Sequence, residues 1–405
     1  TVLWKPAVAL SMSATAISGL TRFLQAGRAA LAAAPPKLHV YTGNQAGDAD
    51  SLVSALCLSY LSSCLHRECQ DSRGLAIPVM SIPRSEFEMR PETAMLWRKA
   101  NVDSKDVIFA DELDLHSEWA QGRLELTLTD HNASSRPSLG DRAGLEAAVT
   151  RIVDHHMDLG ESSHVQGTAR EVAFEEGAAL VGSCCTQVAE HFLKEYKEAL
   201  TLDVALLLLG VILIDTVNLD PSARRATDRD HQVVKLLFEL HPELKERQST
   251  LFQELSDAKF SPTFWSSLTA EQCLRYDYKE MSSTGKDGTK KLVGMSAVLV
   301  RLEDFLDKAA ARQAMRGLLE ERGLDMLAVL TFVVQPQRRR ELLLMAPEQG
   351  TTTVNEAVAF LGANFDLQLE QAESVMQDLG MAGFEQHNTV ASRKQVSPKL
   401  RNSNA

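Results

Sequence analysis

The chain has 405 residues, of which 44% are hydrophobic, so it is long enough to bury the cores of two domains. Its formal net charge of −12 argues against attraction of the whole molecule to nucleic acid. The longest apolar run, "VALLLLGVILI" at 204–214, is too short to cross a bilayer and predicts a buried core helix instead.

The N-terminal segment has an unusual charge pattern, because residues 1–36 contain no Asp or Glu. Transit peptides share this composition, but Leu20, Phe23 and Leu24 are also spaced as one face of an amphipathic helix that packs on the body. The six cysteines form no Cys-x-x-Cys pair, which indicates reduced thiols rather than a disulfide framework. We expect a cytoplasmic protein, and the acid-free segment leaves a mitochondrial or other organellar location open.

Apolar, β-branched runs alternate with helical patterns in the first half of the chain. Continuous apolar strands that are separated by helices indicate a parallel sheet covered on both faces. The sequence therefore predicts an α/β fold with an N-terminal doubly wound parallel sheet. The candidate strands are 38–43, 75–82, 106–111, 124–130 and 149–156.

The second half predicts a smaller α/β domain with a mixed sheet, because strand patterns at 291–301, 326–335 and 341–346 are separated by helical ones. A charged segment after residue 227 leads into this region. The expected division is an N-terminal, helical extension at 1–36, a first domain at 37–235 and a second domain at 236–405.

Acidic, amide and imidazole side chains follow the candidate strands and one core helix. Because the carboxyl ends of parallel strands meet at one edge of a sheet, we expect these side chains to converge there. Hard oxygen ligands suit Mg²⁺ or Mn²⁺, and imidazole also admits Co²⁺ or Zn²⁺. The side chains are Asn44, Asp48 and Asp50, then Asp130, His131 and Asn132, then Asp154, His155 and His156, and finally Asp215.

Each of these residues alone has a simpler interpretation. Asp50 or Ser51 would cap a helix that begins near residue 52, and Asp215 would be a solvated helix end. The ordered series at successive strand ends favours a common site, and several carboxylates are what a pair of metal ions requires.

The order of the motifs also resembles a known family. "GNQAGDADS", "TDHN", "VDHH" and "LIDTVN" resemble the four signatures of the DHH phosphoesterase superfamily. "ASRKQVSPKL" at 391–400 is similar to the Ser-Arg-Lys motif in the second domain of family II inorganic pyrophosphatases and of the eukaryotic exopolyphosphatase and prune group. The resemblance covers residues 38 to 401 and implies a DHH domain, a DHH-associated substrate-binding domain and an active site in the cleft between them.

The resemblance implies roles for individual residues. Asp130 and Asp215 would bridge two divalent ions, Mg²⁺ or Mn²⁺, and the full set of metal ligands would be Asn44, Asp48, Asp50, Asp130, His155 and Asp215. Catalytic roles would fall to Asp130, His131 and His156, with either histidine able to protonate the leaving oxygen. Arg393, Lys394 and His156 would bind the substrate phosphate. Asp154 and Asn132 would orient the ligands, as the partners of metal-binding histidines do.

Two positions bear on the branch of the family. Family II pyrophosphatases have His at the position of Asn44, whereas the exopolyphosphatase and prune group has Asn there. The Asn oxygen is a harder ligand than imidazole and favours Mg²⁺. Animal prune proteins tend to have Arg where this chain has His156, so the pattern resembles fungal or protist exopolyphosphatases most.

The implied activity is hydrolysis of the terminal phosphoanhydride of inorganic polyphosphate by a hydroxide that two metal ions activate, with release of orthophosphate. The alternatives are an inorganic pyrophosphatase or short-chain nucleotide phosphohydrolase, a cyclic-nucleotide phosphodiesterase, and a prune-like scaffold. We expect a monomer with polyphosphate as its partner and no contact with nucleic acid or membrane. The basic run at 338–340 and the lysines at 286–291 would either guide a polyanion or lie on solvated faces.

Overall fold

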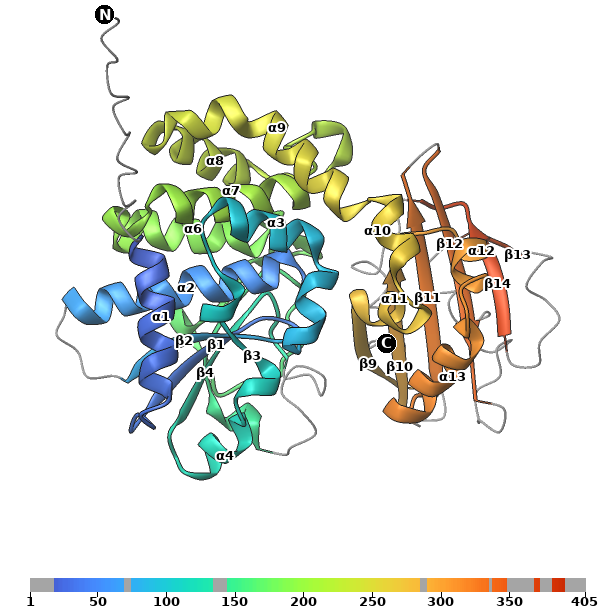
Figure 1. Ribbon diagram of the computed structural model, residues 1–405, viewed down its shortest axis with the longest axis horizontal. Coiled ribbons are helices and arrows are strands. Elements are labelled where there is room, and N and C mark those ends of the chain that lie inside the picture. Colours follow the sequence, from blue (N-terminus) through green and yellow to red (C-terminus); the bar gives the residue numbers. More distant parts are fainter. Residues whose placement is uncertain are drawn as a thin grey trace, which may run out of the picture.

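The computed structural model describes two domains, which lie side by side in Figure 1. The described residues are 18–68, 74–133, 144–284, 290–334, 337–347, 368–371 and 381–389.

The first domain is built on a six-stranded sheet in the order β3-β2-β1-β4-β5-β6, in which every pair is parallel. This confirms the predicted doubly wound sheet. The strands are β1 (Leu38–Thr42), β2 (Leu75–Met80), β3 (Ile108–Phe109), β4 (Leu124–Thr129), β5 (Val149–Asp154) and β6 (Arg170–Val172). A small hairpin of β7 (Phe174–Glu175) and β8 (Ala178–Ala179) follows them.

Helices cover both faces of this sheet and add a further layer on one side (Figure 1). The helices are α1 (Gly19–Leu31), α2 (Ala49–Glu68), α3 (Pro91–Lys99), α4 (Leu115–Ala120), α6 (Cys184–Glu195), α7 (Leu202–Asp215), α8 (Asp228–Leu240) and α9 (Pro242–Lys259). Short 3-10 turns are η1 (Arg84–Met89), η2 (Ser104–Asp106), η3 (Ala110–Glu112), η4 (Leu145–Ala148), η5 (Gly167–Ala169), η6 (Lys197–Ala199) and η7 (Pro221–Ala223).

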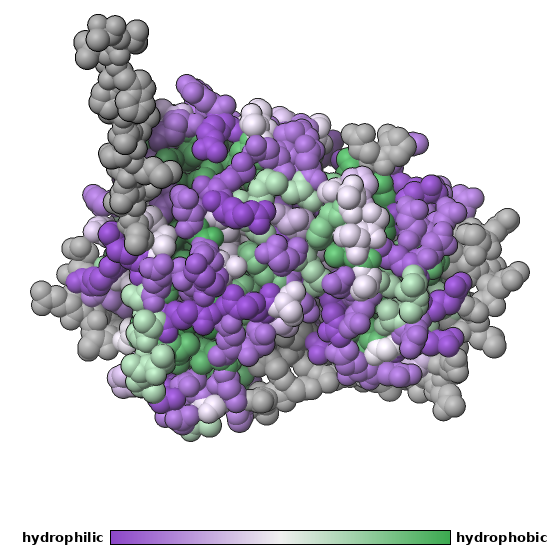
Figure 2. Space-filling model, in the orientation of Figure 1, coloured by the Kyte–Doolittle hydropathy of each residue, from purple (hydrophilic) through white to green (hydrophobic). Residues whose placement is uncertain are grey.

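Helix α7 is apolar all round because it is enclosed by other helices. It packs on α2 and α6 on one side and on α8 and α9 on the other. Every residue from Val204 to Leu213 is buried, as expected of a core helix. None of the described helices is long and apolar enough to span a membrane. On the face shown in Figure 2, hydrophilic residues predominate and hydrophobic ones form scattered patches.

The N-terminal helix packs as the amphipathic pattern predicts. Leu20, Phe23 and Leu24 of α1 are buried in the core that includes α2 and α7, while residues 1–17 lie outside the described part of the chain. Five cysteines (Cys57, Cys64, Cys184, Cys185 and Cys273) are buried free thiols, which agrees with the expectation of reduced cysteine. Cys69 lies outside the described residues.

The second domain has a mixed six-stranded sheet in the order β13-β14-β12-β11-β10-β9, which confirms the predicted class. Only β10 and β11 are parallel among these pairs of described strands. The strands are β9 (Tyr278–Thr284), β10 (Lys290–Val298), β11 (Met326–Val333), β12 (Arg339–Met345), β13 (Leu369–Gln371) and β14 (Met381–Gln386). The helices are α10 (Pro262–Ser267), α11 (Ala270–Tyr276), α12 (Leu302–Leu306) and α13 (Ala311–Arg322).

Helix α9, which follows the predicted boundary at residue 236, packs on the core of the first domain. Leu244, Leu251 and Leu255 of α9 are buried in the same core as α2 and α7. The separate core of the second domain begins with α10, where Trp265 is fully buried. Helices α8 and α9 therefore extend the first domain, because their apolar stripes cover α7.

Candidate active site

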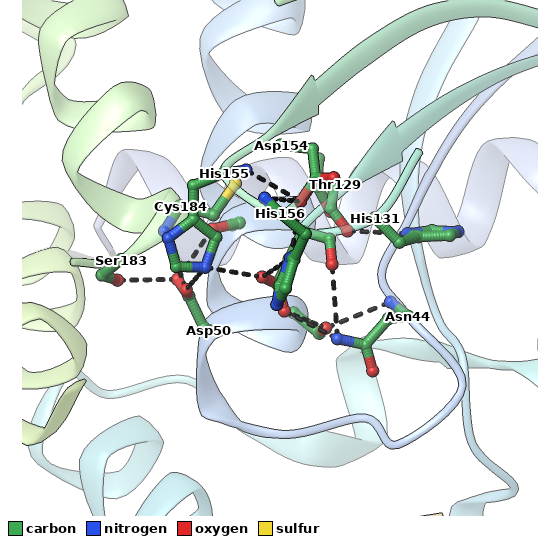
Figure 3. A network of polar contacts seen from close by, with 12 residues as sticks. Asn44, Asp50, Thr129, His131, Asp154, His155, His156, Ser183 and Cys184 are labelled. Carbon is green, nitrogen blue, oxygen red and sulfur yellow. Dashed lines mark hydrogen bonds and ion pairs between the residues drawn. The ribbon is translucent and has the colours of Figure 1, made fainter. Parts of the chain in front are cut away.

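The residues after β1, β4 and β5 meet at one edge of the parallel sheet (Figure 3). Asp130 directly follows β4 and has a left-handed backbone, with φ of 62°. Its backbone N–H donates to Val153 O of β5 at 2.9 Å, which fixes this conformation. Because a left-handed residue other than glycine costs about 1–2 kcal/mol, this turn stores backbone strain next to the two histidines.

The Asp130 carboxylate is held from one side and faces two histidines on the other. Its Oδ2 accepts hydrogen bonds from Asn44 Nδ2 and Ser51 Oγ, both at 2.7 Å. Its Oδ1 lies 3.3 Å from His155 Nε2 and 3.6 Å from His156 Nδ1. The side chain is buried, and burial together with the charge of Asp48 raises the pKa of Asp130.

His155 directs one ring nitrogen toward two carboxylates. Its Nδ1 lies 3.0 Å from Val181 O and must donate to that carbonyl, so in the neutral ring Nε2 carries a lone pair. This Nε2 lies 3.3 Å from Asp130 Oδ1 and 3.7 Å from Asp50 Oδ2. In this tautomer three acceptor atoms converge, and a cation between them would satisfy all three.

Asp50 is fixed by the N-terminus of a helix that lies far away in the sequence. Its carboxylate accepts hydrogen bonds from Ser183 Oγ at 2.8 Å, from Cys184 N at 2.7 Å and from Cys185 N at 2.9 Å. Ser183 is the N-cap of α6, so the positive end of that helix stabilises the carboxylate.

Asp154 organises the loop that carries the two histidines. Its Oδ1 accepts from His156 Nδ1 and from His155 N, both at 2.8 Å, and its Oδ2 accepts from Asn132 Nδ2 at 2.5 Å. Burial alone would raise the pKa of Asp154, but His156, His155 and Asn132 hold it well below the usual range. Asn132 also donates to Met157 O at 3.0 Å, so both residues occupy positions from which they orient the imidazoles.

His131 lies at the same edge with its tautomer set by the backbone. Its Nδ1 donates to Thr129 O at 2.9 Å, and burial lowers the pKa of the ring. The neutral form, with a lone pair on Nε2, is therefore favoured.

Among the described residues, one group of side chains has ligand atoms that all lie within 4.8 Å of one another, and it consists of Asp130, His155 and His156. Asp48 lies next to this group and caps α2, since its Oδ1 accepts from Ser51 N at 3.0 Å. The cap is thus Asp48, not Asp50 or Ser51. Asp215 ends α7.

A lysine of the first domain's last helix lies near both of these outer carboxylates. Burial opposes the charge of Lys259, but Glu92, Asp215 and Asp48 together raise its pKa. Arg393 and Lys394 lie outside the described residues.

Comparisons with known proteins identify the family of the chain. Residues 253–403 match the DHHA2 domain. Over 383 residues the chain is 33% identical to exopolyphosphatase PRUNE1 of Bos taurus. The aligned region covers 94% of this chain and 78% of that protein. The chain belongs to the exopolyphosphatase and prune group of the DHH superfamily.

Two further members of the wider superfamily extend the comparison. A Schizosaccharomyces pombe protein named "Putative exopolyphosphatase" is 28% identical, with 95% of this chain and 98% of that protein covered. The sequence identity is thus higher to the mammalian protein than to the fungal one. His156 pointed to the fungal or protist branch, and the identities do not support that assignment. The "Crystal structure of Methanococcus jannaschii putative family II inorganic pyrophosphatase" matches with a TM-score of 0.60 at 23% identity, covering 90% of this chain and 99% of that one, which supports the two-domain fold.

In this DHH protein, Arg90 binds the backbone of the loop between Asn44 and Asp48. The side chain is 1% exposed and donates to Ala46 O at 2.6 Å and to Gly47 O at 3.2 Å. It also approaches Arg275 O of the second domain at 3.5 Å. No sequence pattern indicates this role of Arg90, because its hydrogen bonds go to backbone carbonyls.

Gln45 joins the same loop to the edge of the second sheet. Its Nε2 donates to Glu280 O at 3.4 Å, and its Oε1 accepts from Glu280 N at 3.2 Å. The adjacent Lys279 is close enough for its charge to act on Asp130 and His131. The one sequence signal for this contact is in the "GNQAGDADS" motif, where the amide side chain of Gln45 lies between the candidate ligands Asn44 and Asp48.

Proposed function

We propose that the chain is a metal-dependent exopolyphosphatase, which hydrolyses the terminal phosphoanhydride of inorganic polyphosphate and releases orthophosphate. The observation that carries the proposal is the buried group of Asp130, His155 and His156 at the carboxyl edge of a parallel sheet, with Asp130 in a strained backbone conformation. The names of the relatives support this substrate class.

We propose that the site holds a pair of divalent cations, Mg²⁺ or Mn²⁺. Converging carboxylate and imidazole acceptors at Asp50, Asp130 and His155 would otherwise repel one another. The proposed ligands are Asn44, Asp48, Asp50, Asp130, His155 and Asp215. When bound, such ions polarise phosphoryl oxygens and make a bound water more acidic.

Proton transfer to the leaving phosphate falls to His156 in this proposal. Its Nδ1–H is directed to Asp154 Oδ1, so its Nε2 is the atom that would hold the proton for the leaving oxygen. His131 is less suited to this task, because burial disfavours a second proton on a ring whose Nδ1–H already bonds Thr129 O. His131 would instead support the substrate phosphate.

Cations of the second domain would bind the anionic substrate. Lys279 approaches the site through the Gln45 contact, and we propose that Arg393 and Lys394 add a bidentate and a point-charge contact to phosphate. Spreading the charge of the transferred phosphoryl group over such contacts is the main task of a phosphohydrolase.

The test is phosphate release from long polyphosphate, tripolyphosphate, pyrophosphate and a cyclic nucleotide, with Mg²⁺ and Mn²⁺ in turn. We expect the highest kcat/KM on polyphosphate, near-complete loss of turnover in Asp130→Ala and mainly a higher KM in Arg393→Ala. A preference for pyrophosphate would replace the proposal with a pyrophosphatase. Silence on all four substrates would indicate a scaffold.

A further inference from the structure

Arg340 is a buried arginine of the second domain without a described acidic partner. It is 8% exposed, its guanidinium lies 4.3 Å from the centroid of the Phe332 ring, and its Nε donates to Thr389 O at 2.8 Å. Within the described residues no carboxylate forms an ion pair with it. Its neighbour Arg339 is different, since Glu341 at 3.2 Å and Glu385 at 3.1 Å both neutralise that side chain.

Two more arginines, from different parts of the chain, lie close enough for their charges to act on Arg340. Arg338 precedes β12, and Arg225 belongs to the first domain, between η7 and α8. Burial, together with the charges of Arg225 and Arg338, lowers the pKa of Arg340 to about 10. Neither Arg225 nor Arg338 forms an ion pair with a described carboxylate, and both are exposed. Like charges that gather without a counter-charge mark a place that an anion would stabilise.

The register of the second sheet relates these arginines to the active site. Lys279 pairs with Met295, Met295 with Ala328, and Ala328 with Leu344, so Leu344 lies level with Lys279 three strands away. Arg340 is four residues from Leu344 on the same strand and therefore lies on the same face as Lys279. The two Cα atoms are roughly 20 Å apart from these strand spacings.

Arg225 and Thr389 also connect this group of arginines to the site. The Arg225 carbonyl oxygen would lie only 2.7 Å from a Cβ at Gly182, next to Ser183, which donates to Asp50. Thr389, which accepts from Arg340, is the last described residue before the segment that contains Arg393 and Lys394.

We propose that Arg225, Arg338 and Arg340 form a second phosphate subsite, which binds the inner phosphates of a polyphosphate chain whose terminal phosphate lies at Asp130, His155 and His156. The inference rests on the proposed function and names a determinant of chain length. A guanidinium fork matches phosphate oxygens, and a separation of this size requires a chain of several phosphates. Nucleic acid is less suited, because the Phe332 ring that could stack on a base is covered by Arg340.

The experiment uses the two exposed arginines, since replacing buried Arg340 would disturb the fold. The double variant Arg225→Gln/Arg338→Gln is compared with Arg339→Gln, a control that removes a neighbouring charge already neutralised by Glu341 and Glu385. The first readout is the ratio of kcat/KM on long polyphosphate to kcat/KM on pyrophosphate. The second is binding of long polyphosphate to the whole 405-residue chain in EDTA, at two salt concentrations.

We expect the ratio and the affinity each to fall by about tenfold or more in the double variant, with a weaker salt dependence, and to stay unchanged in the control. Equal losses on short and long substrates, unchanged polyphosphate binding, or the same loss in Arg339→Gln would overturn the subsite. Loss of single-stranded oligonucleotide binding with polyphosphate binding intact would also overturn it. If the wild-type protein hydrolyses no polyphosphate but the double variant still loses polyphosphate binding, the subsite stands and the proposed activity fails.

Discussion

Asp130→Asn separates the chemical role of this residue from its structural role. The remaining carbonyl oxygen can keep the hydrogen bonds from Asn44 Nδ2 and Ser51 Oγ, and the new NH₂ group would face His155 Nε2 across the present 3.3 Å. Asn also tolerates the left-handed backbone, with φ of 62°, better than most residues do. The fold should therefore accept the change.

The variant should keep or gain stability and lose activity. Replacing a buried carboxylate beside Asp48 by a neutral amide removes a desolvation cost, so the metal-free variant should be as stable as the wild type or about 1 kcal/mol more stable. Removing a ligand charge should lower kcat/KM by about a thousandfold or more, which corresponds to about 4 kcal/mol of transition-state stabilisation.

Phosphate release and thermal unfolding, each in EDTA and in Mn²⁺, measure these two effects. At a Mn²⁺ concentration of about 100 times Kd the wild type should gain about 2.7 kcal/mol, and Asp130→Asn should lose most of that gain. Asp111→Asn is the matched control, because Asp111 is another strand-end acid but accepts its hydrogen bond from Arg84 N at 2.9 Å. Full turnover with an unchanged Mn²⁺ shift in Asp130→Asn would refute the assignment, and so would a metal-free variant destabilised by about 2 kcal/mol or more.

Three further changes test the surroundings of the site. Arg90→Met should lower the free energy of unfolding by about 3–5 kcal/mol in urea titrations, because buried carbonyls lose a charged donor, and Gly47 should exchange its amide hydrogen faster; unchanged exchange would contradict this role. Gln45→Ala should raise KM for polyphosphate while costing only about 1 kcal/mol of stability, since it removes the contact to Glu280; an unchanged KM would show that the contact is incidental. Burial lowers the pKa of His39 from 6.5 to about 4, so the unfolded state takes up its proton first as the pH falls. The wild type should lose about 2 kcal/mol from this group between about pH 7 and pH 5, and His39→Gln should not; equal losses in the two proteins would contradict the assignment.

The parts of the fold that the sequence predicted are those with a strong local pattern. Largely apolar runs identified β1, β2, β4 and β5 because a strand buried on both faces has few polar positions. The end of the first domain was harder to locate. Helix α9 carries leucines at 244, 251 and 255 on one stripe, and such a stripe does not say which neighbour it will cover. The strands β6, β9, β13 and β14 were not predicted. Three of them are edge strands, and edge positions need no apolar alternation, but β14 lies inside its sheet between β12 and β13.

The candidate site also has a part that the sequence predicts and a part that it does not. The motifs identified acids and imidazoles, because metal ligands are side chains. The groups that fix those acids are largely backbone atoms, such as the amides of Cys184 and Cys185 and the carbonyl of Val181. No side-chain pattern can report them, because any residue supplies the same backbone group. Only the fold places the start of α6 against Asp50.

The hydrogen bonds around the aspartates favour different roles for acids that look alike in the sequence. Asp154 accepts hydrogen bonds from both histidines and from Asn132, so its carboxylate orients the imidazole rings. Asp50 is fixed by the start of α6 and offers an oxygen to His155 from a distance of 3.7 Å. Asp130 alone combines a strained backbone with an oxygen directed at both imidazoles. Because protein donors already fix these carboxylates, an incoming cation would meet ligands that need little reorganisation, and the backbone strain at Asp130 is the cost of that preparation.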